Sequence, residues 1–247
     1  MPPTLPSSRS NLITQAEIKQ IRSLREKKFR DESGLFVVEG EKLVQEALAS
    51  GFAVRSVWRR DEIGEAAMSR ISQLSSPPPV LAVVARPEEP AEPVFGEELY
   101  LALDGVRDPG NLGTILRIAD WFGIGTVFVS EDCVEPWNPK SVQASMGSVF
   151  RVRVVTADLP ALARRFRAAG MHVFGTFLDG RDLYREALCP AGLVVMGNEA
   201  SGIRPAVAAE VDARLFIPPF GRTSGAGAES LNVAAATAVT LSEFRRR

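Results

Sequence analysis

The chain has 247 residues, of which 45% are hydrophobic and 24% charged, so it is long and apolar enough to fold around its own core. Two cysteines and one histidine exclude a disulfide framework and leave no cluster with metal-ligand spacing, so we expect no metal. The net charge of −1 excludes a uniformly basic surface, and no apolar run reaches the roughly 20 residues of a membrane helix. We expect a soluble cytoplasmic protein without a membrane partner.

The N-terminal part of the chain predicts a small α/β unit. Apolar residues at helical spacing predict an amphipathic helix over residues 15–28, and Gly34 ends it or begins a turn. Further expected elements are a strand at 35–38, a helix at 41–50, and strands at 54–58 and 80–85. A basic cluster occupies the first segment: Arg22, Arg25, Lys27, Lys28 and Arg30. Such a run is either a solvated helix face or a surface for phosphates.

A segment rich in proline and glutamate follows, between residues 86 and 98. This composition is typical of a semi-rigid linker. We therefore predict an N-terminal domain over residues 1–90, a linker over 91–98 and a second domain over 99–247.

From residue 99 onward, strands alternate with helices. We expect strands at 99–103, 126–129, 152–155, 172–176, 193–196 and 214–217. The expected helices are 111–122, 139–146, 159–169 and 231–244. The strands are apolar throughout, which predicts an α/β fold with a parallel sheet covered on both faces.

Ligands of parallel sheets gather at the carboxyl ends of the strands, so we expect the functional residues in the loops there. Three are unusual: DGVRDPGNLGTILRIAD after Leu103, GNEASGIRP after Met196, and PPFGRTSGAGAESLNVA after Ile217. The glycines of the first do not give the dinucleotide spacing, and Asn111 stands where a phosphate loop needs lysine. A glycine-rich turn remains, feeding a helix whose amino end offers free N–H donors to an anion.

These three motifs carry a family resemblance. Residues 99–247 resemble the SpoU (TrmH-like) RNA ribose 2′-O-methyltransferases of the SPOUT class, on Asp108–Gly113 with Arg117, on Met196–Glu199 with Gly202 and Ile203, and on Ile217, Pro218 and 229–233. The resemblance implies a deep trefoil knot and a homodimer. Residues 12–85, containing GLFVVEGEKLVQEAL, are similar to the RNA-binding domain that often precedes this catalytic domain.

The resemblance also implies a site for S-adenosylmethionine, formed by Thr176, Leu178, Gly197, Ile217, Pro218 and Leu231. An adenine ring needs apolar walls and backbone polar groups, and glycine permits close backbone approach. The structural alternatives are a strand-end glycine at 197 and core packing at Ile217 and Leu231. Here the family's loop between Ile-Pro and Ser-Leu-Asn is lengthened by residues 221–228, so contacts from its middle have no family counterpart.

The catalytic residues that the resemblance implies are Arg117, Asn111, Glu199, Ser230 and Asn232. Four of them have a structural alternative: an ion pair of Arg117 with Asp120, helix caps at Asn111 and Ser230, and a solvated carboxylate at Glu199. An arginine pKa above about 12 makes Arg117 a poor base. We expect it to hold the phosphate of the reacting nucleotide and to polarise the 2′-oxygen.

The resulting hypothesis is methyl transfer from S-adenosylmethionine to a ribose 2′-hydroxyl of structured RNA, ribosomal or transfer, gripped by the basic cluster. The alternative is an RNA-binding protein of the same fold that has lost methyl transfer, an alternative suggested by the lengthened loop. A Rossmann methyltransferase would need a glycine fingerprint that this chain lacks.

Overall fold

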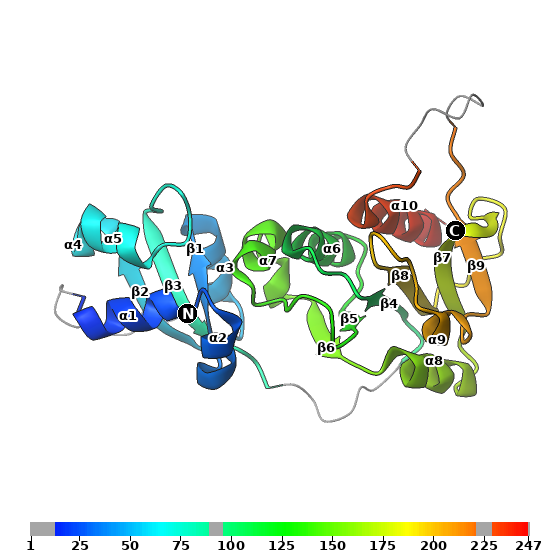
Figure 1. The fold of residues 1–247 in the computed structure, drawn as a ribbon, viewed down its shortest axis with the longest axis horizontal. Coiled ribbons are helices and arrows are strands. Elements are labelled where there is room, and N and C mark those ends of the chain that lie inside the picture. The colour runs from blue at the N-terminus through cyan, green and yellow to red at the C-terminus, as the bar shows by residue number, and fades with distance from the viewer. Residues whose placement is uncertain (1–12, 89–95, 221–228, 247) are drawn as a thin grey trace.

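The computed structural model describes residues 13–88, 96–220 and 229–246, and arranges them around two sheets (Figure 1). Residues 13–88 form the N-terminal unit and the other described residues form the C-terminal unit. The predicted linker over 91–98 lies mostly outside the described residues, as does the lengthened loop 221–228.

The N-terminal unit is an antiparallel sheet of strand order β1-β3-β2 with helices on both faces. Its elements are α1 (Gln15–Ser23), α2 (Lys27–Ser33), β1 (Leu35–Glu39), α3 (Glu41–Ala49), β2 (Val54–Arg59), α4 (Arg60–Ile63), α5 (Glu65–Ile71) and β3 (Val80–Ala85). The predicted strands and the helix at 41–50 are confirmed within a residue or two, whereas α4 and α5 were not anticipated.

The prediction of one helix over residues 15–28 is wrong, because the chain turns after Ser23 and starts again as α2. Thr14 and Glu17 form a reciprocal capping box at the start of α1. Gly34 ends α2 with a φ of +65°, a conformation that favours glycine. The basic cluster is therefore divided between two helices and the turn that joins them.

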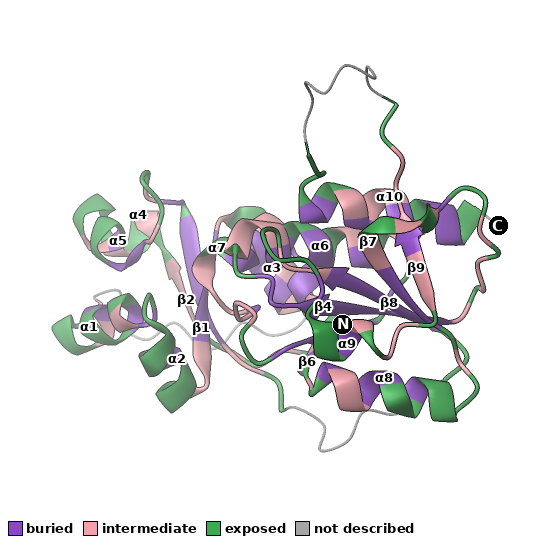
Figure 2. Cartoon of the chain, turned by 45° about the vertical axis from the view of Figure 1, so that its right-hand side comes forward, coloured by how far each residue is buried: buried purple, intermediate pink, exposed green. Residues whose placement is uncertain are grey.

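The C-terminal unit is built on a six-stranded parallel sheet of order β6-β5-β4-β8-β7-β9. Its strands are β4 (Leu99–Asp104), β5 (Thr126–Val129), β6 (Arg153–Thr156), β7 (Val173–Asp182), β8 (Gly192–Gly197) and β9 (Ala213–Phe216). Central strands are buried along their length (purple in Figure 2). Leu101 and Leu103 point into one core and Tyr100 and Ala102 into the other, as expected for a sheet covered on both faces.

Helices cover both faces of this sheet (Figure 1). On one face lie α6 (Pro109–Trp121) and α10 (Val233–Arg246); on the other lie α8 (Leu159–Ala168) and α9 (Pro205–Ala208). The helix α7 (Pro139–Ser145) and the short 3₁₀ helix η1 (Ser148–Phe150) pack against α6. The predicted α/β class and covered parallel sheet are confirmed.

Strand β7 continues beyond the predicted end at Thr176. Thr176 and Arg181 both pair with Leu215, so residues 177–180 loop out of the strand. Gly180 permits the loop to return, because a Cβ there would lie 2.6 Å from the carbonyl carbon of Leu215. The loop leaves the side chain of Leu178 70% exposed at the carboxyl end of the sheet.

The close approach of α6 and α7 depends on Gly113, one of the motif glycines. A Cβ at this position would lie 2.3 Å from the carbonyl oxygen of Ser141 and 2.6 Å from the Cβ of Ala144. A backbone oxygen cannot give way as a flexible side chain can, so this glycine is required by helix packing.

We expect Gly113→Ala to lower the free energy of unfolding by about 1–3 kcal/mol, because overpacking outweighs the higher helix propensity of alanine. Urea denaturation measures the change. Gly125→Ala is the matched control, since nothing lies within 4 Å of a Cβ there. Equal stability of the two variants would contradict the explanation.

Candidate active site

The three sequence motifs meet at the side-chain amide of Asn111. Its Nδ2 donates to Glu199 Oε1 at 2.8 Å, and its Oδ1 accepts from Nδ2 of Asn232 at 2.9 Å. Asn111 lies in the first turn of α6, which comes after β4; Glu199 follows β8, and Asn232 precedes α10. Residues up to 121 positions apart in the chain therefore form one polar network at the carboxyl ends of the strands.

Asn111 is available for this network because another residue caps its helix. Asp108 is the N-cap of α6, and its Oδ1 accepts from the backbone N–H of Asn111 at 2.8 Å. Pro109 occupies the first turn, where its missing N–H costs nothing. The alternative in which Asn111 is the cap is wrong, and the amide is free to join the other two motifs.

Asn232 has two functions at the start of α10. Its Oδ1 accepts from the backbone N–H of Ala234 at 2.9 Å, while its Nδ2 reaches Asn111. The cap that the sequence suggested at Ser230 is therefore misplaced, since α10 begins at Val233. Ser230 is exposed two residues before the network residue Asn232.

The loop that carries Glu199 is held by its own chain. Asn198 and Gly202 pair as an isolated bridge, and Asn198 Nδ2 donates to the carbonyl of Gly105 at 2.6 Å. A Cβ on Gly197 would lie 2.3 Å from the carbonyl carbon of Gly202. The Gly197 position therefore needs glycine for the closure of this loop, whatever else the glycine does for a ligand.

An ion pair that the sequence did not reveal, between exposed Arg204 and buried Asp104, fixes the end of the same loop. The Asp104 carboxylate is fully buried and accepts from Arg204 at 2.6 Å through Nε and at 2.7 Å through the backbone N–H. The hydrogen bond to Asp104 raises the pKa of Arg204 above its ordinary value. The sequence feature that could have revealed this ion pair is the aspartate that ends an otherwise apolar strand, LYLALD.

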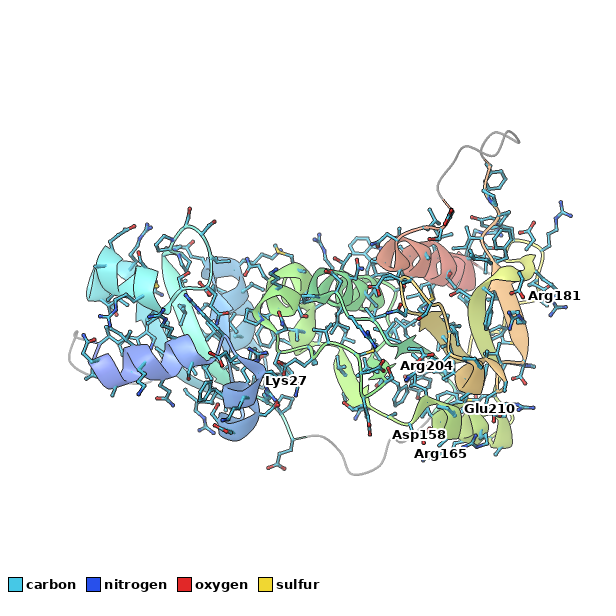
Figure 3. All side chains as sticks on the ribbon, viewed as in Figure 1. Lys27, Asp158, Arg165, Arg181, Arg204 and Glu210 are labelled. Atoms are coloured by element: carbon cyan, nitrogen blue, oxygen red, sulfur yellow. The ribbon has the colours of Figure 1, made fainter. Side chains whose placement is uncertain are left out.

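Arg204 (labelled in Figure 3) also faces Asp132, whose Oδ1 lies 3.4 Å from its Nη2. The hydroxyl of Ser130 donates to Asp132 at 2.8 Å, and this bond, followed by the charge of Arg204, lowers the pKa of the Asp132 carboxyl. Arg204 thus connects the end of β4 with the loops that follow β5 and β8.

Arg117 lies on the exposed side of α6, outside this network. It lies six positions after Asn111, which corresponds to about 120° around the helix and about 9 Å along it. The suggested ion pair with Asp120 is absent from the described residues: Asp120 Oδ2 instead accepts from Ser148 and Arg151, both at 2.8 Å. Thr114 and Trp121 share the exposed face, and Trp121 is 84% exposed.

The residues expected to bind the methyl donor border the same strand ends. Leu178 and Leu231 are 70% and 52% exposed, and Ile217 and Pro218 are half-buried. The hydroxyl of Thr176 lies 3.7 Å from the sulfur of Met196. Uncovered apolar side chains beside backbone at strand ends fit a ligand that carries an aromatic base. Residues 221–228, which belong to the same loop as Pro218 and Leu231, lie outside the described residues.

Two surface hollows lie away from these strand ends. One, of about 580 Å³, is lined by Arg164, Arg167, Glu210 and Asp212, whose charges pair with one another. The other, of about 390 Å³, adjoins Phe52 and Arg86. Neither adjoins the motif residues, so neither is the candidate active site.

The described residues, 13–88, 96–220 and 229–246, hold neither a metal-binding group nor a membrane-spanning helix. There, no three His, Cys, Asp or Glu side chains are grouped so that they could hold a metal ion, and no helix has the length and hydropathy to cross a bilayer.

Most of the basic cluster is paired with acidic groups or carbonyls of this chain. Lys27 lies 2.6 Å from Asp31 and Lys28 lies 3.9 Å from Glu32. Arg25 donates to the carbonyl of Ser72, and Arg22 is exposed. The expectation that Arg30 contacts RNA is wrong, because its side chain is 2% exposed and binds Glu135.

Comparisons with known proteins were consistent with one family. The model of the SpoU rRNA methylase family matches residues 98–242, and that of the MRM3-like substrate binding domain matches residues 15–90. The chain is 32% identical over 245 residues to the 23S rRNA (guanosine(2553)-2′-O)-methyltransferase RlmP of Bacillus subtilis, covering 93% of this chain and 96% of the relative.

Two solved structures resemble the whole chain. A protein of the TrmH family from Porphyromonas gingivalis has a TM-score of 0.85 and 42% identity, over 95% of this chain and 98% of that one. The AdoMet-bound rRNA methyltransferase of Sinorhizobium meliloti has a TM-score of 0.84 and 34% identity, over 95% and 97% of the two chains.

The ion pair of Arg204 with Asp104 predicts that Arg204 contributes more to stability than the neighbouring Arg107. We expect Arg204→Ala to lower the free energy of unfolding by about 1–3 kcal/mol, since it leaves the buried Asp104 carboxylate with only the backbone N–H of residue 204 as its partner on this loop. Arg107→Ala is the control: Arg107 is 73% exposed and 3.4 Å from Asp132, so its loss costs about 0.5 kcal/mol or less. Similar losses in urea denaturation would refute the role given to Asp104.

Proposed function

The chain belongs to the SpoU rRNA methylase family, and from this we propose that it transfers a methyl group from S-adenosylmethionine to a ribose 2′-hydroxyl of ribosomal RNA. The observation that carries the proposal is the Asn111 amide, which joins all three motifs in one network. The alternative of an RNA-binding protein without methyl transfer is not favoured, because the motif residues are present and in contact. Relatives over the whole chain are named as rRNA 2′-O-methyltransferases.

The donor site that we propose consists of Thr176, Leu178, Gly197, Ile217, Pro218 and Leu231. Exposed apolar side chains on the β7 bulge and before α10 support it, as does the backbone at the ends of β8 and β9. When bound there, S-adenosylmethionine supplies an electrophilic methyl group on a sulfonium sulfur. The protein's task is alignment of the acceptor oxygen, which can lower a barrier by about 7–11 kcal/mol.

We assign the acceptor side to Asn111, Glu199, Ser230, Asn232 and Arg117. The network holds the Glu199 carboxylate and leaves Ser230 exposed beside it, where a ribose can hydrogen-bond. Arg117 cannot take the hydroxyl proton, because an arginine pKa lies above about 12. Its guanidinium instead holds the phosphate of the reacting nucleotide and polarises the 2′-oxygen, while the proton leaves late or is shared with that phosphate.

We propose that the protein acts as a homodimer. Trp121, at 84% exposure, lies on the same uncovered face of α6 as Arg117 and Thr114. An exposed tryptophan is typical of a protein interface. A second copy covering this face would enclose Arg117, which within the described residues of one copy has no partner in the Asn111 network. Molar mass from light scattering tests the dimer.

We also propose that the C-terminal domain, residues 99–247, is a deep trefoil knot. The strand order supports it, because β8 lies between β4 and β7 and the chain then returns to add β9 beyond β7. The final helix α10 packs back on α6 and β8, both of which precede it by many residues. Small residues Ala234 and Ala236 on α10 suit such a close passage.

The N-terminal domain, residues 1–90, is proposed to bind the RNA substrate, with 91–98 as its linker. The match to a substrate binding domain over residues 15–90 supports this. Arg22, Arg25, Lys27 and Lys28 remain as the phosphate-binding residues, since each is exposed. Arg30 is not among them because its side chain is buried.

We expect Arg117→Ala to reduce methyl transfer by at least about 100-fold, because a donor aimed at developing negative charge is lost. Donor binding by calorimetry should change little, since Arg117 lies outside the proposed donor site. The assay follows labelled methyl groups into ribose of total RNA, and mapping 2′-O-methyl positions identifies the acceptor. Label only in transfer RNA would overturn the choice of ribosomal RNA, and undiminished transfer by the variant would overturn the role of Arg117.

Replacing both Lys27 and Lys28 by Glu should weaken RNA binding. The slope of log affinity against log salt concentration should become shallower by about 1 for each phosphate contact that is lost. Filter binding between low and physiological salt measures both. Arg165→Glu on α8 is a control with an exposed side chain on the other domain. Unchanged affinity and slope in the double variant would exclude α2 from the RNA surface.

A further inference from the structure

The N-terminal and C-terminal units are joined by a nearly buried carboxylate, that of Glu135 in the segment after β5. Arg30 on α2 donates through Nε to Glu135 Oε1 at 2.9 Å, and Arg86 after β3 donates through Nη2 to Oε2 at 3.0 Å. The side chains of Glu135, Arg30 and Arg86 are 12%, 2% and 18% exposed. One carboxylate of the C-terminal unit therefore binds two guanidinium groups of the N-terminal unit.

These arginines also hold the basic helix in place. Nη1 of Arg30 donates to the carbonyl oxygens of Leu24 and Arg25, both at 2.7 Å, which fixes the turn between α1 and α2. Arg86 donates to Asp31 at 2.8 Å, and Asp31 in turn pairs with Lys27 (labelled in Figure 3). The bonds from Lys27 and Arg86 lower the pKa of the Asp31 carboxyl. The proposed phosphate-binding helix α2 is thus linked to Glu135 by side-chain bonds.

An aromatic cluster also packs the N-terminal and C-terminal units against each other. Phe36 and Phe52 come from the N-terminal unit, and Trp137 and Phe150 from the C-terminal unit. Ring centroids of Phe36 and Trp137 are 4.7 Å apart, and those of Phe52 and Phe150 are 5.2 Å apart at an angle of 85°. Trp137 follows Glu135 by two residues, so one short segment supplies both the charge and the ring.

A third contact between the two units involves helix α6. Arg151 donates to Asp120 on α6 and also pairs with Glu46 on α3. Gly147 has a φ of +99°, and a Cβ there would lie 2.9 Å from Cγ of Glu46. Asp120 lies one turn after Arg117, so the N-terminal unit is packed against the helix that carries the proposed catalytic arginine.

Buried ion pairs contribute little net stability, because desolvation of the charges offsets their attraction, but they are demanding in geometry. An aromatic cluster alone could hold the two units together in more than one orientation. The bonds to Glu135 allow only those orientations of the two units in which the guanidinium groups of Arg30 and Arg86 both reach its carboxylate.

We propose that Glu135 is a positioning residue for methyl transfer, which by holding Arg30 and Arg86 fixes the orientation of the RNA-binding helix α2 relative to the active site. An RNA that contacts both units is then presented with one ribose at the Asn111 network. The proposal rests on the proposed function. It concerns RNA long enough to span both units and predicts no effect on the donor site.

The test compares Glu135→Gln with the unaltered full-length chain on two substrates. One is unmodified 23S rRNA transcript, and the other is a short oligonucleotide around the mapped nucleotide, too short to reach the N-terminal unit. Glu131→Gln is the matched control, an exposed glutamate in the same segment. Single-turnover rates at saturating RNA, RNA affinity and donor affinity are measured for each chain, together with thermal unfolding.

We expect Glu135→Gln to lower the single-turnover rate on the transcript by about 10-fold to 100-fold more than on the oligonucleotide, as misorientation of a bound substrate does. RNA affinity and donor affinity should stay within about threefold of the unaltered chain, which a general loss of structure would not allow. Arg86→Gln, which leaves the Arg30 bond in place, should act in the same direction. It also keeps the test open if Glu135→Gln does not fold, since Arg86 is the more exposed of the two arginines.

Equal loss on both substrates, or a parallel loss of donor binding, would overturn the positioning role and make Glu135 a structural residue of the C-terminal unit. Unchanged rates in a folded Glu135→Gln or Arg86→Gln chain would overturn it as well. Failure of the unaltered chain to methylate ribose would instead overturn the proposed function, and this inference with it.

Discussion

The side-chain amide of Asn111 is the interaction on which the candidate active site depends. A side-chain amide donates through its nitrogen and accepts through its oxygen, and Asn111 uses both atoms, donating to Glu199 and accepting from Asn232. A carboxylate in its place could not donate to Glu199, and an apolar residue could bind neither partner. The three motifs come from distant parts of the chain, so this one group converts their proximity into a defined arrangement. The amide is free to do so only because Asp108 caps the helix in its place.

The sequence predicted the C-terminal sheet well because parallel strands buried on both faces are apolar throughout, and every predicted strand there exists. It could not predict the break after Ser23, since the apolar spacing of Ile18, Ile21 and Leu24 is continuous. The turn is held by bonds from the Arg30 guanidinium to two backbone carbonyls, which no apolar pattern reveals. The cap at Ser230 was misplaced by two residues because Ser and Asn are both good caps. Gly113 and Gly197 belong to the motifs, yet their neighbours show that packing of this chain already requires glycine at both positions.

The RNA-binding residues were also difficult to predict from the sequence. Five basic residues in one stretch suggested a nucleic-acid surface, but a count of charges does not reveal their partners. Arg30 is used inside the protein, and Lys27 and Lys28 face Asp31 and Glu32 one helical turn away. The net charge of −1 already indicated that acidic partners were plentiful. The RNA surface of such a chain depends on which cations remain exposed after the structural pairs are formed, and this is a property of the fold.

Helix α6 connects these observations. Its amino end carries Asn111 and the network; its middle carries Arg117 on the exposed face; its carboxyl end carries Asp120, which binds Ser148 and Arg151 and through Arg151 reaches Glu46 of the N-terminal unit. A helix is stiff over this length of about 20 Å, since each residue advances it by about 1.5 Å. The contacts of the N-terminal unit therefore reach the same helix that carries the proposed catalytic residues. In that sense the side chains that join the two units belong to the chemistry of the site as much as to the stability of the fold.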